Sequence, residues 1–212
     1  MSDRAEFLID LSSLSSNVSK IKKECAVEIL AVVKADAYGH GLMGIGLSAE
    51  KAGADWLGVA MLEEAITLRQ SGISAPILAW LTPITDDFSS ALENEIDIAI
   101  PSLAHLAAVL QAAQTTKRIP RIHLEVDTGM SRGGFLDEWG KIDGHHVANV
   151  DIVGIFSHFA RADEPQEKQN DAQRNRFKEM VATVESFGYT NIVRHLSNSA
   201  ATLKDAQSRF DM

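Results

Sequence analysis

Residues 28–41 read EILAVVKADAYGHG, an apolar run that ends at a lysine and passes into a polar, glycine-containing segment. A continuous apolar run of this length, bounded by turn-forming residues, is typical of a strand that is buried on both faces. Six similar runs follow along the chain, at residues 56–60, 77–81, 96–100, 121–126, 152–157 and 192–196. The sequence therefore predicts seven strands, of which residues 28–33 form the first.

The segments between these runs have helical periodicity. Leu103, Leu106, Ala107 and Leu110 recur at i, i+3, i+4 and i+7, which places one apolar stripe on a helix. Further helices are expected from residue 11, over residues 42–52, 62–70 and 88–92, and around residues 177–184. Parallel strands need such crossover connections and antiparallel strands do not, so the alternation predicts parallel βαβ units.

Two architectures fit this alternation, a closed barrel and an open doubly wound sheet. The Gly-x-Gly-x-x-Gly motif of dinucleotide-binding sheets does not follow the first strand, which favours a parallel (β/α)8 TIM-type barrel. Such a barrel takes about 250 residues. We therefore expect residues 1–212 to form one incomplete barrel domain that is truncated before the last strand.

Composition excludes several classes of function. The net charge of -9 leaves no basic surface for nucleic acid, and no apolar run is long enough to cross a membrane. Charges within the first ten residues, MSDRAEFLID, argue against a secretory signal, and the single Cys25 excludes an internal disulfide. A cytoplasmic protein is expected.

The active sites of TIM-type barrels lie at the carboxyl ends of the strands, where loops vary without disturbing the core. The side chains expected at that rim come from residues 34–38, Trp80 and residues 127–132, 157–159 and 195–200. They include seven candidate site residues: Lys34, Tyr38, Trp80, Arg132, His158, Asn198 and Ser199. A lysine that ends an apolar strand is suited to act as an imine-forming nucleophile. The rim is therefore the candidate site.

Taken singly, these residues also have ordinary structural explanations. Lys34 can extend into solvent from the rim, and Asn198 and Ser199 can serve as helix N-caps. His158 can be a histidine satisfied at a strand end, and Arg132 can pair with a nearby carboxylate. Only their shared position on one rim favours a function.

Four segments together resemble the alanine racemase family. They are VVKADAYGHG at residues 32–41, EVDTGMSRGGF at 125–135, SHFARADE at 157–164 and HLSNSAATL at 195–203. The first resembles the family's cofactor-lysine signature. The resemblance implies a pyridoxal phosphate-dependent isomerase that interconverts L- and D-alanine in the cytoplasm and supplies D-alanine for the cell wall.

The resemblance also implies a homodimer in which an eight-stranded barrel is followed by a mostly β C-terminal domain, for which this chain has no matching residues. Lys34 would hold the cofactor as an aldimine and act as the base on one face of the substrate. The second base would be a tyrosine from the partner's C-terminal domain. We therefore expect little or no racemase activity from this chain alone.

The remaining roles follow from the matching motifs. Tyr38 and Ser199 would contact the cofactor phosphate, Asn198 would shape that pocket, and Trp80, in ILAWLTP, would line the cofactor. His158 would belong to the hydrogen-bond network behind the pyridine ring.

Arg132 would approach the cofactor's phenolic oxygen and the substrate carboxylate. Seven residues earlier many family members have a carbamylated lysine, whereas this chain has Glu125. The hypothesis is that Glu125 orients Arg132 directly by a charge-assisted hydrogen bond. The alternative is that Glu125 is merely an acid at the end of a strand.

Three other functions compete with this interpretation. A barrel-only pyridoxal phosphate-binding protein, which handles the cofactor without catalysis, fits the chain length, and a basic amino-acid decarboxylase uses the same barrel. A metal-dependent barrel hydrolase would need clustered ligands. No metal site is expected, because five histidines are not spaced with carboxylates as a ligand set: His40, His105, His123, His145 and His146.

Overall fold

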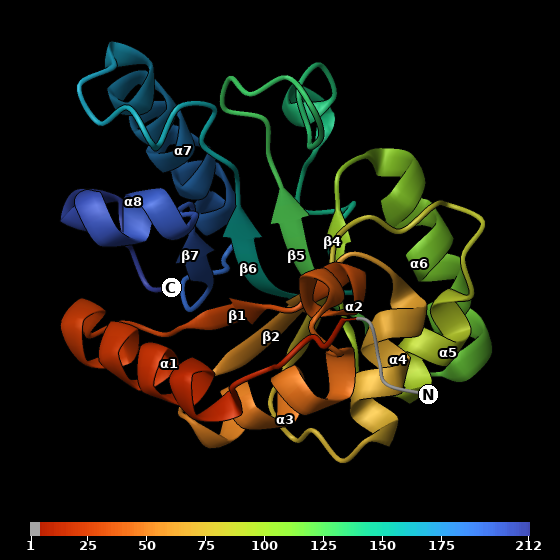
Figure 1. The fold of residues 1–212 in the computed structure, drawn as a ribbon. Helices are drawn as coiled ribbons and strands as arrows, with labels where there is room; N and C mark the ends of the chain where they lie inside the picture. Colours follow the sequence, from red (N-terminus) through yellow and green to blue (C-terminus); the bar gives the residue numbers. More distant parts are fainter. Residues whose placement is uncertain (1–4) are drawn as a thin grey trace.

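Seven parallel strands form one curved sheet in the computed structural model, which describes residues 5–212 (Figure 1). The strands are β1 Leu30–Val32, β2 Trp56–Val59, β3 Ile77–Ala79, β4 Asp97–Ile100, β5 Arg121–Glu125, β6 Asp151–Phe156 and β7 Val193–His195. Each strand pairs with the next one in the chain, always in parallel. The predicted βαβ alternation is therefore confirmed.

Helices connect the strands and cover the outer face of the sheet (Figure 1). The α-helices are α1 Leu11–Cys25, α2 Lys34–Gly39, α3 Leu42–Lys51, α4 Leu62–Gln70, α5 Phe88–Glu93, α6 Leu103–Thr116, α7 Lys168–Ser186 and α8 Ser199–Lys204. Two short 3-10 helices, η1 Trp139–Lys141 and η2 Ala206–Ser208, lie in the later loops. The expected helices are all present.

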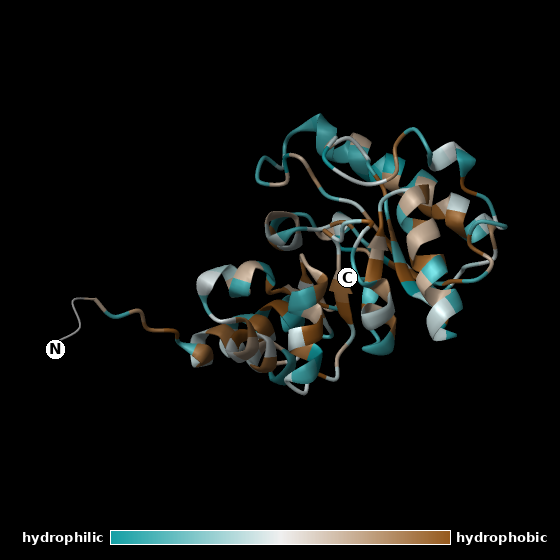
Figure 2. Cartoon of the chain, turned by 90° about the vertical axis from the view of Figure 1, so that its right-hand side faces the viewer, coloured by the Kyte–Doolittle hydropathy of each residue, from teal (hydrophilic) through white to brown (hydrophobic). Residues whose placement is uncertain are grey.

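The sheet is buried where helices pack against it. Every residue of β2 and of β4 is buried, as expected for strands covered on both faces. In Figure 2 brown, apolar residues occupy the central strands and parts of the surrounding helices. Helix α6 buries Leu106, Val109 and Ala112, whereas Ala107 of the predicted stripe is exposed, so its buried face is rotated from the expected one.

The two edges of the sheet, β1 and β7, are bridged by Asp211. Its backbone N–H donates to the carbonyl of Arg194 at 3.1 Å, and its carbonyl accepts the N–H of Glu28 at 2.9 Å. Its carboxylate also binds the Arg194 guanidinium at 2.6 Å. Residues 5–212 thus contribute seven strands to the barrel-like sheet, and Asp211 occupies the position between its first and last strands.

Two predictions concern membrane spans and an N-terminal signal. Among the helices of residues 5–212, none is long and apolar enough to span a bilayer. Part of the charged N-terminal segment used in the signal prediction, residues 1–4, lies outside the described residues.

Candidate functional site

Lys34 lies directly beyond β1, with its side chain half-buried and facing an aromatic ring. Its Nζ is 5.7 Å from the centroid of the Trp80 ring, which follows β3. Gly58 of the intervening β2 makes room for that ring, because a Cβ there would lie 2.5 Å from Trp80 Cζ3. Three neighbouring strands therefore place an amine beside an aromatic wall, a favourable arrangement for a cation.

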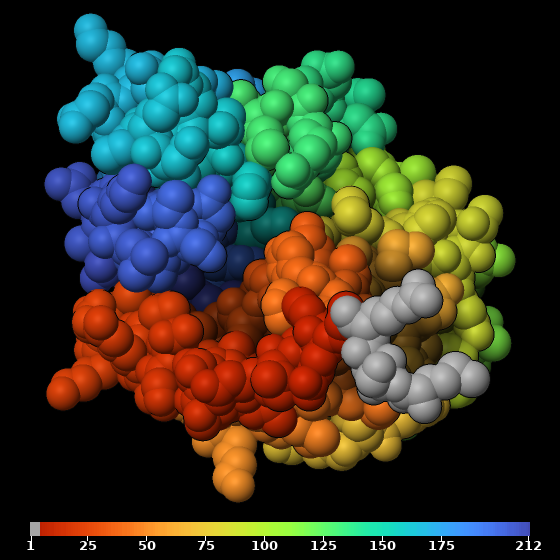
Figure 3. All heavy atoms as spheres, viewed as in Figure 1, coloured from red at the N-terminus to blue at the C-terminus, as the bar shows by residue number. Residues whose placement is uncertain are grey.

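The segment after Lys34, expected to be a loop, is a left-handed helical turn. Ala35, Asp36, Ala37 and Tyr38 all have φ between 53° and 56°. The turn ends where the Asp36 carboxylate accepts the Leu42 N–H at 2.7 Å. It presents the Tyr38 side chain at the surface, where 61% of the residue is exposed. In Figure 3 this segment, in orange, borders a recess whose far side is teal and blue.

Arg132 is carried by a loop that folds back onto the end of β5. The Asp127 carboxylate accepts three backbone N–H groups of the loop, from residues 129, 130 and 131, at 2.8–3.0 Å. Phe135 then returns to the strand and donates its N–H to the Glu125 carbonyl at 2.8 Å. Gly134 has φ +98° and no room for a Cβ. The loop is thereby fixed at both ends, and Arg132 lies exposed at its tip.

Glu125 lies beneath this loop with a half-buried carboxyl group. A Cβ on Gly133 would come within 3.1 Å of its Oε1, so the carboxyl packs against the loop backbone. Burial raises the pKa of Glu125 to about 7, while Arg132 opposes the rise and Asp127 adds to it. Within residues 5–212 no hydrogen bond or ion pair joins Glu125 to Arg132, whose charge alone affects the Glu125 pKa, so the hypothesised direct bond is not made.

His158 follows β6 on the same rim. Gln173 of α7 donates to the His158 carbonyl at 2.9 Å and accepts the Ala160 N–H at 3.0 Å, which fixes the local backbone. Loss of hydration lowers the pKa of His158, and the positive charges of Arg132 and Lys34 lower it further. Lys34 and Arg132 therefore both act electrostatically on His158.

Asn198 and Ser199 lie at the start of α8, beyond β7. Asn198 is the N-cap, and its Oδ1 accepts the Ala201 N–H at 3.1 Å. The capping role considered for Asn198 is therefore confirmed. Ser199 is the first helical residue and is exposed. Within residues 5–212 neither side chain is hydrogen-bonded to Lys34, Arg132 or His158.

Sequence reasoning missed a polar column inside the sheet. His123 Nδ1 lies 2.9 Å from His195 Nε2, and His123 Nε2 lies 3.8 Å from an Asp97 oxygen. Arg121 holds the Asp97 carboxylate with two bonds of 2.7 and 3.0 Å. Burial and the neighbouring His123 lower the pKa of His195 well below its ordinary value. The period-two spacing of Arg121 and His123 in RIHLE was the available signal, since it places both on one face.

Gly154 of β6 is the residue that admits this column. A Cβ at that position would lie 2.4 Å from His123 Nδ1. The His195 ring stacks on Phe156 with centroids 4.9 Å apart, and Trp56 meets His123 edge-on at 5.2 Å. The column is therefore packed by aromatic rings.

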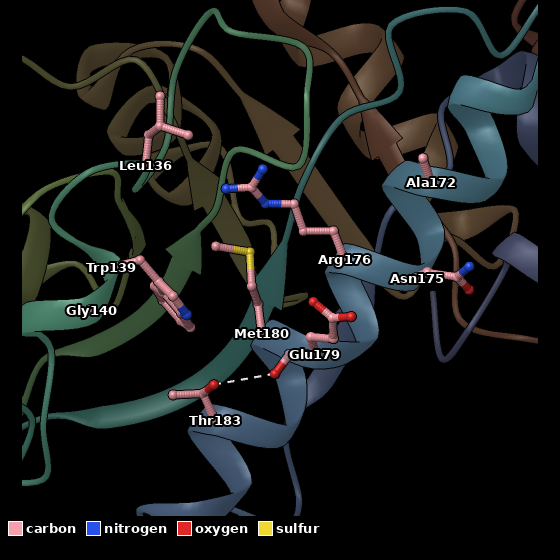
Figure 4. Close-up of a pocket in the computed structure, with 9 residues that line it drawn as sticks. All are labelled: Leu136, Trp139, Gly140, Ala172, Asn175, Arg176, Glu179, Met180 and Thr183. Atoms are coloured by element: carbon pink, nitrogen blue, oxygen red, sulfur yellow. Dashed lines mark hydrogen bonds between the residues drawn. The ribbon is translucent and has the colours of Figure 1, made fainter.

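A surface groove also lies outside the sheet, between α7 and the η1 region (Figure 4). Trp139 and Met180 supply apolar surface, and Arg176 and Glu179 supply charge. None of the seven predicted site residues lines it. Within residues 5–212 no group of three His, Cys, Asp or Glu side chains is arranged to hold a metal ion.

Comparisons with known proteins agree with the geometry. Residues 9–212 match the family described as "Alanine racemase, N-terminal domain". Alanine racemase of Salinispora arenicola is 42% identical, over 99% of this chain and 58% of that protein. The protein of the same name from Mycobacterium tuberculosis is 37% identical, over 98% and 56%.

Solved structures give the same result. The alanine racemase from D-cycloserine-producing Streptomyces lavendulae has a TM-score of 0.92 at 38% identity, over 96% of this chain and 55% of that one. The alanine racemase from Bacillus anthracis with bound L-Ala-P has a TM-score of 0.85 at 32% identity, over 98% and 56%. The chain thus spans little more than half the length of these relatives.

Proposed function

The chain belongs to the alanine racemase family, matched over residues 9–212, and we propose that it is the barrel part of an enzyme that interconverts L- and D-alanine. One observation carries the proposal: Lys34 faces the Trp80 ring at 5.7 Å on the rim that also holds Arg132 and His158. A nucleophilic amine, an apolar wall and a second cation are thereby combined in one place. Every relative described above is named alanine racemase, so the barrel-only alternative gains no support.

The rim residues suit pyridoxal phosphate as cofactor. The Lys34 amine is the group that would hold it, Trp80 offers a flat apolar wall, and the positive charges of Lys34 and Arg132 suit an anionic ligand. We assign the phosphate end to the Tyr38 and Ser199 hydroxyls, which are both exposed, beside Asn198. When bound, pyridoxal phosphate stabilises the negative charge that develops at the substrate α-carbon.

The chain's own residues then divide the remaining work. Lys34 is positioned to take or return the α-proton on one face of the substrate. Arg132, held at the tip of its loop, is suited to bind the substrate carboxylate. His158, whose lowered pKa favours the neutral ring, supplies a hydrogen-bonding group at the same rim. Glu125 acts on Arg132 through its charge and through the loop backbone.

Racemisation needs a second base on the opposite face of the substrate. The chain has two tyrosines. Tyr189 is occupied elsewhere, because its hydroxyl donates to the Val147 carbonyl at 2.7 Å, and we assign Tyr38 to the phosphate. In keeping with what the family resemblance implies, we propose that the second base is a tyrosine from the C-terminal domain of a partner subunit in a homodimer. The cytoplasmic location stays a prediction.

The test is to incubate the purified chain with pyridoxal phosphate, reduce with borohydride and map the labelled peptide. The label is expected on Lys34, and Lys34→Met should abolish it, whereas Lys51→Met, at an exposed lysine of α3, should not. D-alanine formation from L-alanine is then measured with and without a full-length relative to supply the partner residue. A label distributed over surface lysines in the wild type would contradict the assignment.

A further inference from the structure

The left-handed turn after Lys34 is a strained conformation. Each non-glycine residue in it carries a Cβ close to a carbonyl oxygen, which costs about 1–2 kcal/mol, and four such residues follow one another from Ala35 to Tyr38. Such strain persists only where the surroundings over-determine the backbone. Some contact must therefore hold the turn where it leaves Lys34.

Glu64 supplies that contact from the next βα unit. Its Oε1 accepts the Ala35 N–H at 2.6 Å. Its Oε2 accepts the N–H groups of Ala60 and Met61 at 3.0 and 3.1 Å. One carboxylate thus joins the peptide that follows Lys34 to the start of α4, and hydrogen bonds to an ionised acceptor are the stronger kind.

The other bonds of the turn do not reach this peptide. The Val33 carbonyl accepts from Ala37 at 2.8 Å, and the Asp36 carboxylate accepts from Leu42. The first of these bonds holds the peptide that precedes Lys34 and the second acts later in the turn, so neither engages the Ala35 N–H. Ala35 is itself exposed, so packing does not immobilise it. Within residues 5–212, the Glu64 carboxylate is the group bonded to the first N–H after Lys34.

We propose that Glu64 is a positioning residue for Lys34: by holding the Ala35 peptide it fixes the Lys34 backbone, and so directs the amine toward the Trp80 ring. The inference rests on the proposed function, which supplies pyridoxal phosphate as the group that the Lys34 amine binds. Gln at position 64 keeps the size but turns an NH2 group toward backbone donors, so at least one of the three bonds is lost. Asp keeps the charge but is one methylene too short to bridge both loops.

The experiment compares wild type, Glu64→Gln, Glu64→Asp and Glu63→Gln. Glu63 is the matched control, because it is exposed in the same first turn of α4 and makes none of these bonds. Two quantities are measured: amide hydrogen exchange at Ala35 without cofactor, and the rate at which pyridoxal phosphate is trapped on Lys34 by borohydride. Acylation of Lys51 reports the general reactivity of exposed lysines, and the thermal midpoint of unfolding reports global stability.

Wild-type Ala35 should exchange slowly despite its exposure. Glu64→Gln and Glu64→Asp should raise that exchange and slow trapping on Lys34 by about tenfold or more, the effect of losing a hydrogen bond to a charged group, while Glu63→Gln matches wild type. Fast exchange at Ala35 in the wild type would overturn the proposal even if the variants fail to fold. Unchanged trapping in folded Glu64 variants would also overturn it. Absence of any Lys34 label in the wild type would instead reject the proposed function, and the exchange result would still decide whether Glu64 holds the turn.

Discussion

Replacing Glu125 with Gln should stabilise the protein, and more so at higher pH. The pKa of Glu125 is raised to about 7, against 4.5 for an ordinary glutamate, mainly by burial. Between these two values the folded protein binds a proton that the unfolded chain has released, so stability falls as pH rises. A difference of one between the folded and unfolded pKa changes the free energy of unfolding by about 1.36 kcal/mol. The wild type should therefore lose about 2 kcal/mol from this group between pH 5.5 and pH 8, whereas the uncharged amide loses nothing.

The assay is urea unfolding followed by tryptophan fluorescence at pH 5.5, 6.5, 7.5 and 8.0, a range that stays above the sequence pI of 5.2. The quantity of interest is the free energy of unfolding of Glu125→Gln minus that of wild type. It should increase by about 2 kcal/mol across the range. Glu93→Gln, at an exposed position of α5, is the control and should give a constant difference. A constant difference for Glu125→Gln as well would refute the argument that burial controls this carboxyl.

Three further changes test other parts of the site. Gly58→Ala should push Trp80 off its position and lower the free energy of unfolding by about 1–3 kcal/mol, seen as a shifted tryptophan emission, because the added Cβ would lie 2.5 Å from the ring; an unchanged emission and stability would contradict this. Arg132→Gln should raise the pKa of His158 toward its ordinary value, since Arg132 is one of the charges that lower it; NMR titration of the ring measures this, and an unchanged midpoint would count against the cluster. Asp97→Asn should make the free energy of unfolding less sensitive to acid. Burial alone would raise the pKa of Asp97, but His123 and Arg121 hold it below 3.8, so the wild type keeps the stabilisation from this carboxylate above pH 3.8 and loses it as the pH falls through the folded pKa. An equal loss of stability in acid for wild type and variant would reject the ion pair as its source.

The strands were predictable because burial on both faces leaves a simple record in the sequence. The apolar run at residues 28–33 contains β1, and residues 96–100 contain β4, whose residues are all buried. The predicted strands were one or two residues too long at several ends, because apolar residues continue beyond the last hydrogen bond between paired strands. The buried face of α6 was less predictable. Its composition is apolar on several sides, and packing against α5 and β4 selects Val109 and Ala112.

The rim positions were predictable for the same reason, since the end of each strand fixes where the next side chains lie. The left-handed turn was not, because alanine disfavours positive φ and Ala35 and Ala37 both adopt it. A carboxylate 29 residues later in the chain bonds the turn, and sequence periodicity does not report such contacts. The direct bond between Glu125 and Arg132, hypothesised from the family resemblance, is not made within residues 5–212, and the carboxyl packs against Gly133 instead.

The buried column of Asp97, His123 and His195 has a consequence for the orientation of its protons. A carboxylate oxygen 3.8 Å from His123 Nε2 favours a hydrogen on that nitrogen. In the neutral tautomer of His123 with its hydrogen on Nε2, Nδ1 is the acceptor in the 2.9 Å bond and His195 Nε2 donates the hydrogen. A neutral His195 ring consequently keeps a lone pair on Nδ1. In this tautomer both imidazoles direct a hydrogen toward the amino end of β4, where Asp97 lies, and a hydrogen-bond donor would be the group that extends the column beyond His195.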